Sequence, residues 1–205
     1  MNDFTFEGSN RPALYETYEW DNTWIEQAND PGTGRILYIG DSISCATRRI
    51  ATAAAEGKLL FDGFGTSKGI DNPYFKDSIR LFAAQQPGRA AVVFNNGLHG
   101  WHLDVQAYGR YYEDMICFLR NLFPDTPLLL ALTTAIASYR GNDRVREENR
   151  QVLKLAERYA LPVIDLYTVS KGFLGEDGIH LTQDGYEALA GEIVRVLKGS
   201  GIRYV

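Results

Sequence analysis

The stretch RILYIGDSI, residues 35–43, contains a short apolar run that ends in a Gly-Asp-Ser turn. Turn-forming residues precede it at 30–34, so the run has the length of a single strand. Its apolar character is continuous and does not alternate with polar residues, which is typical of a strand covered on both faces of a parallel sheet. We therefore predict a buried strand that leads through the turn into an alanine-rich helix at 43–58.

The rest of the chain repeats this order of short apolar runs and longer amphipathic stretches. Further strands are predicted at 59–61, 89–96, 127–134 and 161–166. Further helices are predicted at 71–86, 104–123, 142–159 and 182–198. The glycine-rich stretch 63–69 is expected to be a loop. This alternation predicts an α/β fold, a three-layer α/β/α sandwich around a five-stranded parallel sheet.

The length of 205 residues and the hydrophobic content of 45% fit one globular domain. We expect residues 1–34 to form an N-terminal segment that packs on a single domain formed by residues 35–205. Trp20 and Trp24 lie four positions apart in that segment. They are interpreted as core anchors on a short helical stretch, because side chains at this spacing share one face of a helix.

Composition excludes several classes of partner. A formal net charge of −5, from 21 basic and 26 acidic residues without long runs, argues against nucleic acid. The N-terminus has no apolar signal-type region, and no stretch approaches the roughly 18 apolar residues of a membrane span. Cys45 and Cys117 fall in predicted helices and are interpreted as small buried thiols. We expect a cytoplasmic protein without a membrane partner, and its oligomeric state stays open.

Chemistry-bearing residues lie near both ends of the predicted sheet domain. Ser42 follows the first strand, and Asp177-Gly178-Ile179-His180 follows the last. Ligand sites of open parallel sheets lie at the carboxyl ends of the strands, so we expect both motifs on one rim. There a serine, a histidine and a carboxylate would form a nucleophilic triad. Each motif alone is also explained as an ordinary turn, with Asp41 or Ser42 as a helix cap and Asp177 bonded to nearby amides.

With both motifs in place, the chain resembles the SGNH-type hydrolases, or GDSL family, over residues 35–198. The family's first block is matched by Gly40-Asp41-Ser42-Ile43, with isoleucine in place of the common leucine. The resemblance implies a flavodoxin-like sheet and a serine esterase with Ser42 as nucleophile. It also implies His180 as general base and Asp177 as the group that orients it. We expect neither a metal nor a cofactor.

The third block of the family departs from its usual pattern. Gly97-Leu98-His99-Gly100 stands where the family has Gly-x-Asn-Asp, so His99 occupies the asparagine position. The Asn-x-Gly-Leu-His sequence is similar to a carbohydrate-active subset of these hydrolases. The expected side-chain donor to the oxyanion is His99 or Asn96, because a neutral imidazole N–H can also donate. As an alternative, His99 is a plain turn histidine.

The family also implies backbone donors in the oxyanion hole. These are the amide of Ser42 and that of a glycine after the second strand. In this chain we expect the second backbone donor to be the amide of Gly65, with that of Lys68 or Gly69 as alternatives, because the register in the 63–69 stretch is open by a few residues.

The pocket is expected to include Trp101, His102 and Tyr139, which follow the third and fourth predicted strands. Packing roles are the alternative for these side chains. No apolar insertion resembles a lipid-binding lid, so a short acyl ester is favoured, with acetyl groups on carbohydrate first. Other possibilities are an acyltransferase and a catalytically weak carbohydrate-binding module. A phosphate- or nucleotide-binding protein ranks last, because the glycine-rich stretch lacks the P-loop pattern.

Overall fold

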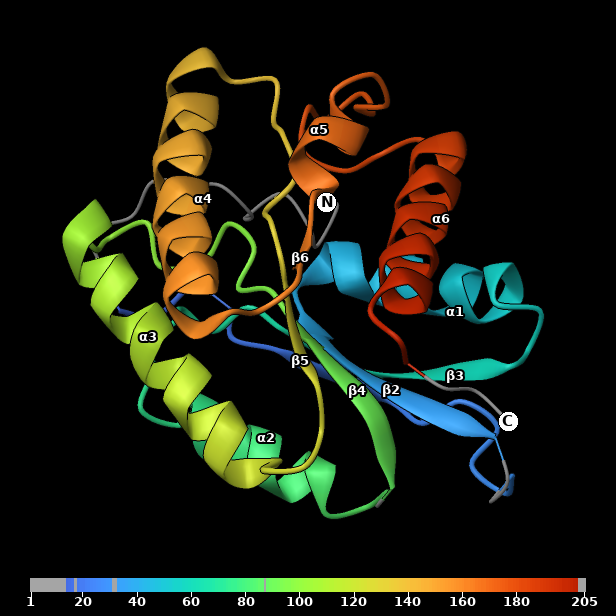
Figure 1. Cartoon of the computed structure of the whole chain (residues 1–205). Coiled ribbons are helices and arrows are strands. Elements are labelled where there is room, and N and C mark those ends of the chain that lie inside the picture. Colours follow the sequence, from blue (N-terminus) through green and yellow to red (C-terminus); the bar gives the residue numbers. More distant parts are fainter. Residues whose placement is uncertain (1–13, 17, 31–32, 87, 203–205) are drawn as a thin grey trace.

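The computed structural model describes residues 14–16, 18–30, 33–86 and 88–202, in which a central sheet is covered by helices on both faces (Figure 1). The strands are β1 (Asp21–Trp24), β2 (Gly34–Gly40), β3 (Leu59–Thr66), β4 (Arg89–Phe94), β5 (Leu128–Ala131) and β6 (Val163–Ile164). The helices are α1 (Ser42–Ala54), α2 (Phe75–Ala83), α3 (Val105–Leu122), α4 (Tyr139–Tyr159), α5 (Leu166–Ser170) and α6 (Gln183–Gly199).

The predicted three-layer α/β sandwich is confirmed, with one strand more than expected. The described sheet has six strands in the order β1-β3-β2-β4-β5-β6. The five strands from β3 to β6 in this order pair in parallel, and β1 pairs antiparallel with the outer edge of β3. The short helix α5 was not predicted from the sequence.

The helical interpretation of the tryptophan pair is wrong. Trp24 lies in β1 and is 38% exposed, with the guanidinium carbons of Arg48 and Arg49 at 5.4 and 5.3 Å from its ring centroid. Trp20 is half-buried and directly precedes the strand. Hydrogen bonding of β1 to the free edge of β3 overrides the local spacing of the two side chains, as tertiary context commonly overrides local propensity.

The expected loop at 63–69 is also wrong in its first half, because β3 continues to Thr66. Glycines occur in this strand because α1 packs closely upon it. A Cβ atom on Gly63 would lie 2.4 Å from Cδ of Arg48, and one on Gly65 would lie 2.2 Å from Sγ of Cys45. Glycine in a strand commonly marks such a close approach rather than a turn.

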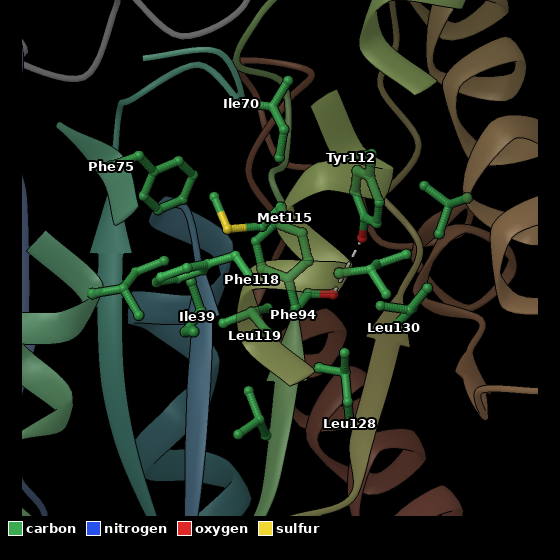
Figure 2. Close-up of a cluster of buried hydrophobic side chains, with 14 of the residues drawn as sticks. Ile39, Ile70, Phe75, Phe94, Tyr112, Met115, Phe118, Leu119, Leu128 and Leu130 are labelled. Carbon is green, nitrogen blue, oxygen red and sulfur yellow. Dashed lines mark hydrogen bonds between the residues drawn. The ribbon is translucent and has the colours of Figure 1, made fainter. Parts of the chain in front are cut away.

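Successive side chains of the strands point to opposite faces and build two separate cores. Leu37 and Ile39 of β2 contribute to the core covered by α2, α3 and α4. Figure 2 shows part of this core, where the hydroxyl of Tyr112 donates to the carbonyl oxygen of Phe94. Ile36 of β2 contributes to the other core, which α1 and α6 cover. The continuous apolar character of β2 thus reflects burial on both faces.

The two cysteines differ in their exposure. Cys45 is partly buried on α1, whereas Cys117 is exposed on α3. The prediction of a buried thiol is therefore wrong for Cys117. The core face of α3 is formed by its neighbours Met115, Ile116 and Leu119, and residue 117 falls outside that stripe.

A buried ion-pair network connects β1 to the middle of the sheet. Asp62 of β3 accepts a hydrogen bond of 2.8 Å from Nη1 of Arg35 and also pairs with Arg89. The other oxygens that Arg35 contacts are the backbone carbonyls of Glu26, Gln27 and Asp30, in the connection from β1 to β2. This network fixes the β1–β2 connection against the sheet.

A buried carboxyl on α4 supports the loop that follows β4. Glu148 has no exposed surface, and Nε of Arg144 donates to its Oε1 at 2.6 Å. Arg144 also donates through Nη2 to the carbonyl oxygen of Leu103. Burial raises the pKa of Glu148 to about 7, and Arg144 opposes this only in part.

This raised pKa predicts a pH-dependent stability. The protonated Glu148 contributes to the free energy of unfolding, and this contribution is fully present below the pKa of glutamate in the unfolded chain. It is lost as the pH rises through about 7, because the folded protein retains a proton over this range that the unfolded chain releases. Glu148→Gln should therefore flatten the loss of unfolding free energy between about pH 5 and pH 8, by about 3 kcal/mol. Urea unfolding across this range measures it. Glu157→Gln, at an exposed position on the same helix, is the control, and equal slopes in both variants would contradict the assignment.

Candidate active site

Ser42 lies where β2 meets α1, at the carboxyl edge of the sheet. It is the first residue of α1 and is 8% exposed. The carboxylate of Asp41 caps the helix by accepting from the amide of Ile43 at 3.0 Å, and the hydroxyl of Ser44 donates to the Asp41 carbonyl oxygen at 2.7 Å. The helix N-terminus therefore directs its positive end toward the serine.

The second part of the site is a tight loop between α5 and α6. Oδ1 of Asp177 accepts from the amides of Ile179 and His180, at 2.9 and 2.8 Å. Gly178 has a φ of +72°, a conformation that favours glycine. The carbonyl oxygen of Gly178 accepts from the amide of Ala137 at 2.8 Å, which ties this loop to the segment after β5. The local turn thus fixes the Asp177 carboxylate beside the His180 ring.

The structure brings Ser42, His180 and Asp177 together in one hydrogen-bonded chain. Nε2 of His180 lies 3.0 Å from Oγ of Ser42, and Nδ1 of His180 lies 2.6 Å from Oδ2 of Asp177. A carboxylate at Nδ1 holds the proton on that nitrogen and leaves Nε2 as the acceptor for the serine proton. This arrangement can deprotonate the serine hydroxyl as it attacks an electrophile.

Asp177 is ionised in this arrangement. Burial alone would raise its pKa, but the amide of Ile179, the ring of His180 and the amide of His180 donate to the carboxylate, and the net pKa is below its usual value. The carboxylate is therefore ionised at neutral pH, where it accepts from Nδ1 of His180.

Asp41 also connects the serine to the loop after β4. Gly97 packs directly against the Asp41 side chain, so a Cβ on Gly97 would lie 1.8 Å from Oδ2 of Asp41. Gly97 has a φ of +67°, and Thr133 donates through Oγ1 to its carbonyl oxygen at 3.2 Å. The loop that carries His99 is thereby positioned against the first turn of α1.

The two predicted side-chain donors, His99 and Asn96, lie in this loop. His99 is 2% exposed, and its Nδ1 lies 3.6 Å from Oε1 of Glu16. Nδ2 of Asn96 donates to the carbonyl oxygen of Lys68 at 3.1 Å, so this amide connects the loop to the end of β3. Glu16 comes from the N-terminal segment, and the sequence analysis missed it because no motif surrounds it.

The glycine candidates take different positions. Gly65 lies within β3, in register with Gly40, and a Cβ on it would lie 3.2 Å from the carbonyl oxygen of Asp41. Gly69 lies beyond the end of β3, and a Cβ on it would lie 3.3 Å from Cα of Gly100. Gly65 is thus beside the start of α1, and Gly69 is beside the 97–102 loop.

The pocket candidates are spread more widely. Trp101 is half-buried and packs around Leu98 and Ile136. Nε2 of His102 lies 2.7 Å from Oδ2 of Asp71, and the His102 side chain is 15% exposed. Tyr139 is 80% exposed at the start of α4. Trp101 and His102 thus lie in the same loop as His99 and are at least half-buried, whereas the Tyr139 side chain is on the surface.

A narrow cavity is lined by Asp41 and Ile43, the two chain neighbours of Ser42, and Ser42 itself is not among its lining residues. Its free volume is about that of one water molecule. The lining residues are Tyr38, Asp41, Ile43, Asn95, Leu132, Thr134 and Leu166.

Within the described residues, no group of three or more His, Cys, Asp or Glu side chains could hold a metal ion. None of the helices described is long and apolar enough to cross a membrane.

Solved structures show what this architecture is similar to. A GDSL-like lipase from Bacteroides thetaiotaomicron matches with a TM-score of 0.64 and 16% identity, over 81% of this chain and 88% of that chain. A lipase/acylhydrolase from Enterococcus faecalis matches with a TM-score of 0.59 and 21% identity, over 82% and 97%. A carbohydrate esterase family 3 protein from Talaromyces cellulolyticus matches with a TM-score of 0.65 and 14% identity, over 82% and 98%.

The chain shares the fold of these hydrolases. No family model matches the sequence, and no curated protein matches it. Identities this low show common architecture and do not carry residue roles. The roles of the individual side chains must therefore be argued from the geometry of this chain.

The contact between Gly97 and Asp41 predicts a specific loss of stability. In Gly97→Ala, the new methyl group would displace the Asp41 carboxylate from the α1 cap, at a cost of about 0.5–2 kcal/mol beyond the strain of the positive φ. Gly57→Ala is the matched control, because Gly57 has a φ of +71° and a methyl group there would meet nothing within 4 Å among the described residues. Urea unfolding compares the two, and equal losses would contradict the role of the Asp41 contact.

Proposed function

We propose that the protein is a serine ester hydrolase with Ser42 as nucleophile, His180 as general base and Asp177 as the group that orients it. The observation that carries this proposal is the continuous hydrogen-bonded chain from Asp177 through His180 to Ser42, with distances of 2.6 and 3.0 Å. The fold it shares with lipases, acylhydrolases and a carbohydrate esterase supports ester hydrolysis at the general level.

The reaction proceeds by acyl transfer to the serine and then to water. Nε2 of His180 takes the hydroxyl proton as Oγ of Ser42 attacks the ester carbonyl, and a tetrahedral oxyanion forms. His180 then gives the proton to the leaving alcohol, and an acyl-enzyme remains. In the second half, His180 deprotonates a water molecule that attacks the acyl group, and the proton returns to Ser42 as the acid leaves. Asp177 stabilises the imidazolium in both halves.

The developing negative charge forms at the N-terminus of α1. The amide of Ser42 and the positive end of the helix are fixed there before the reaction begins. His99 is proposed as the side-chain donor, because it is buried in the loop that Gly97 holds against Asp41. A donor of this kind contributes about 2.7–4 kcal/mol to transition-state stabilisation.

A short acyl group, with acetyl as the first candidate, is the proposed substrate. The cavity lined by Asp41 and Ile43, the chain neighbours of Ser42, has about the volume of one water molecule and leaves no room there for a long acyl chain. The alcohol half is proposed to be a small molecule or a carbohydrate, in line with the carbohydrate esterase among the structural neighbours.

Ser42→Ala should abolish turnover of p-nitrophenyl acetate, with a loss of roughly 10⁶-fold in kcat, because the attacking oxygen is removed. A fluorophosphonate probe should label the wild type at Ser42 and leave the variant unlabelled. A series of p-nitrophenyl esters from acetate to palmitate tests the acyl length. Residual turnover in Ser42→Ala would contradict the mechanism, and highest kcat/KM on long chains would contradict the proposed substrate.

Asp177→Asn tests the orienting role of this carboxylate. The asparagine oxygen can still accept from the amides of Ile179 and His180, so the loop should keep its shape. The amide nitrogen would then face Nδ1 of His180 and move the ring proton to Nε2, which no longer accepts the serine proton. We expect a loss of kcat on the order of 10⁴-fold with unchanged unfolding free energy. Full activity of this variant would exclude the proposed triad.

A further inference from the structure

The N-terminal segment before β1 is fastened across the carboxyl end of β3. The amide of Trp20 donates to Oγ of Ser67 at 2.9 Å, and the amide of Ser67 donates to the carbonyl oxygen of Trp20 at 3.1 Å. Glu19 accepts from Oγ of Ser67 through Oε2 and from the amide of Glu16 through Oε1, at 3.1 and 3.0 Å. Residue 16 is therefore held at a defined place beside the candidate active site.

Glu16 forms a largely buried pair with His99. Oε1 of Glu16 lies 3.6 Å from Nδ1 of His99, and their side chains are 20% and 2% exposed. Oε2 of Glu16 is buried, and no donor among the described residues lies within hydrogen-bond distance of it. A carboxylate removed from water needs a positive charge nearby, or it loses several kcal/mol of solvation. The His99 ring is placed to supply that charge.

We propose that Glu16 is a positioning residue that keeps His99 doubly protonated, with one proton on Nδ1 facing the carboxylate and the other on Nε2 available to the oxyanion. This inference rests on the proposed ester hydrolysis for its catalytic consequence. It replaces the neutral imidazole expected from the sequence with an imidazolium whose counter-ion comes from the N-terminal segment.

The positions of the two ring nitrogens support this charge state. A neutral imidazole has a single N–H, and the Glu16 carboxylate, in ion-pair contact 3.6 Å from Nδ1, favours the tautomer that places the proton on that nitrogen. Nε2 of a neutral ring would then present a lone pair, which repels an oxyanion. With the proton held on Nδ1, His99 donates through Nε2 only when the ring is doubly protonated. The nearby carboxylate favours that charged form, while the burial of the ring opposes it. A charged donor also forms a hydrogen bond roughly twice as strong as that of a neutral amide.

Two further carboxylates around the 97–102 loop act in the same direction, while the Arg144 guanidinium, which donates to the carbonyl oxygen of Leu103, acts against it. The Asp41 carboxylate packs against Gly97, and the Asp71 carboxylate accepts from His102 within the loop. Both groups are anions when ionised, and they add negative potential that stabilises a cation at His99. The proton on His99 is not transferred during the reaction, because His180 carries all proton transfers of the mechanism.

The charge state of the His99 ring can be measured without an activity assay. The chain has three histidines, so ring nitrogens in long-range ¹H–¹⁵N spectra can be assigned with His99→Asn and His102→Asn. At neutral pH, both ring nitrogens of His99 should show the protonated chemical shift in the wild type. In Glu16→Gln, one of them should move to the unprotonated value. Glu157→Gln is the control, because it removes the same charge from an exposed position on α4, outside the segment that holds Glu16. A neutral His99 in the wild type, or no change in Glu16→Gln, would overturn the proposal.

Kinetics with p-nitrophenyl acetate test the catalytic consequence. Glu16→Gln should lower kcat on the order of 10²-fold, the range for loss of one oxyanion donor, with little change in KM. In a His99→Asn background, the same substitution should have no further effect, because an asparagine amide donates without a counter-ion. Equal losses in both backgrounds would show a structural role and overturn the proposal. If the wild type neither turns over esters nor reacts with the fluorophosphonate, the proposed function is wrong. The NMR spectra would in that case still show whether His99 is doubly protonated beside Glu16.

Discussion

The Asp41 carboxylate is the contact on which the rest of the candidate site depends. It caps α1 at the amide of Ile43, and Gly97 packs directly against it. One side chain therefore fixes two things, the helix turn that carries Ser42 and the loop that carries His99. The cap requires a carboxylate in a defined place, and Gly97 has no side chain that would displace it. The proposed nucleophile Ser42 and the proposed oxyanion donor His99 are therefore both positioned by Asp41. Their relative position does not depend on flexible surface contacts.

The two-sided core makes this arrangement rigid. The strands bury residues on both faces, so β2 is held by one core under α2, α3 and α4 and by another under α1 and α6. The site lies at the carboxyl ends of these strands, where the loops are free to carry polar groups. Near the amino end of the parallel strands, the Arg35–Asp62 pair fixes the β1–β2 connection against the sheet. At the opposite end, the described residues before β1 are bound beyond the end of β3 and place Glu16 beside His99.

Sequence reasoning predicted the alternation of strands and helices, because that alternation relies on local apolar periodicity. It failed where a tertiary contact overrides the local pattern. The Trp20 and Trp24 spacing suggested a helix, but the free edge of β3 pairs with this stretch as a strand. The glycines of the 63–69 stretch suggested a loop, but they allow α1 to approach β3. In both cases the deciding partner is distant in the sequence, so no local window contains it.

The sequence by itself determined that the Gly-Asp-Ser turn and the Asp177 to His180 motif would meet on one rim. Parallel strands all end at the same edge of the sheet, so any fold with this alternation places residues that follow the strands together. Only the tertiary structure decided that Glu16 would stand beside His99 and that Gly97 would press on Asp41. These contacts join segments with no repeat, motif or periodicity in common, and they depend on how the loops and the described residues before β1 pack at the carboxyl end of the sheet.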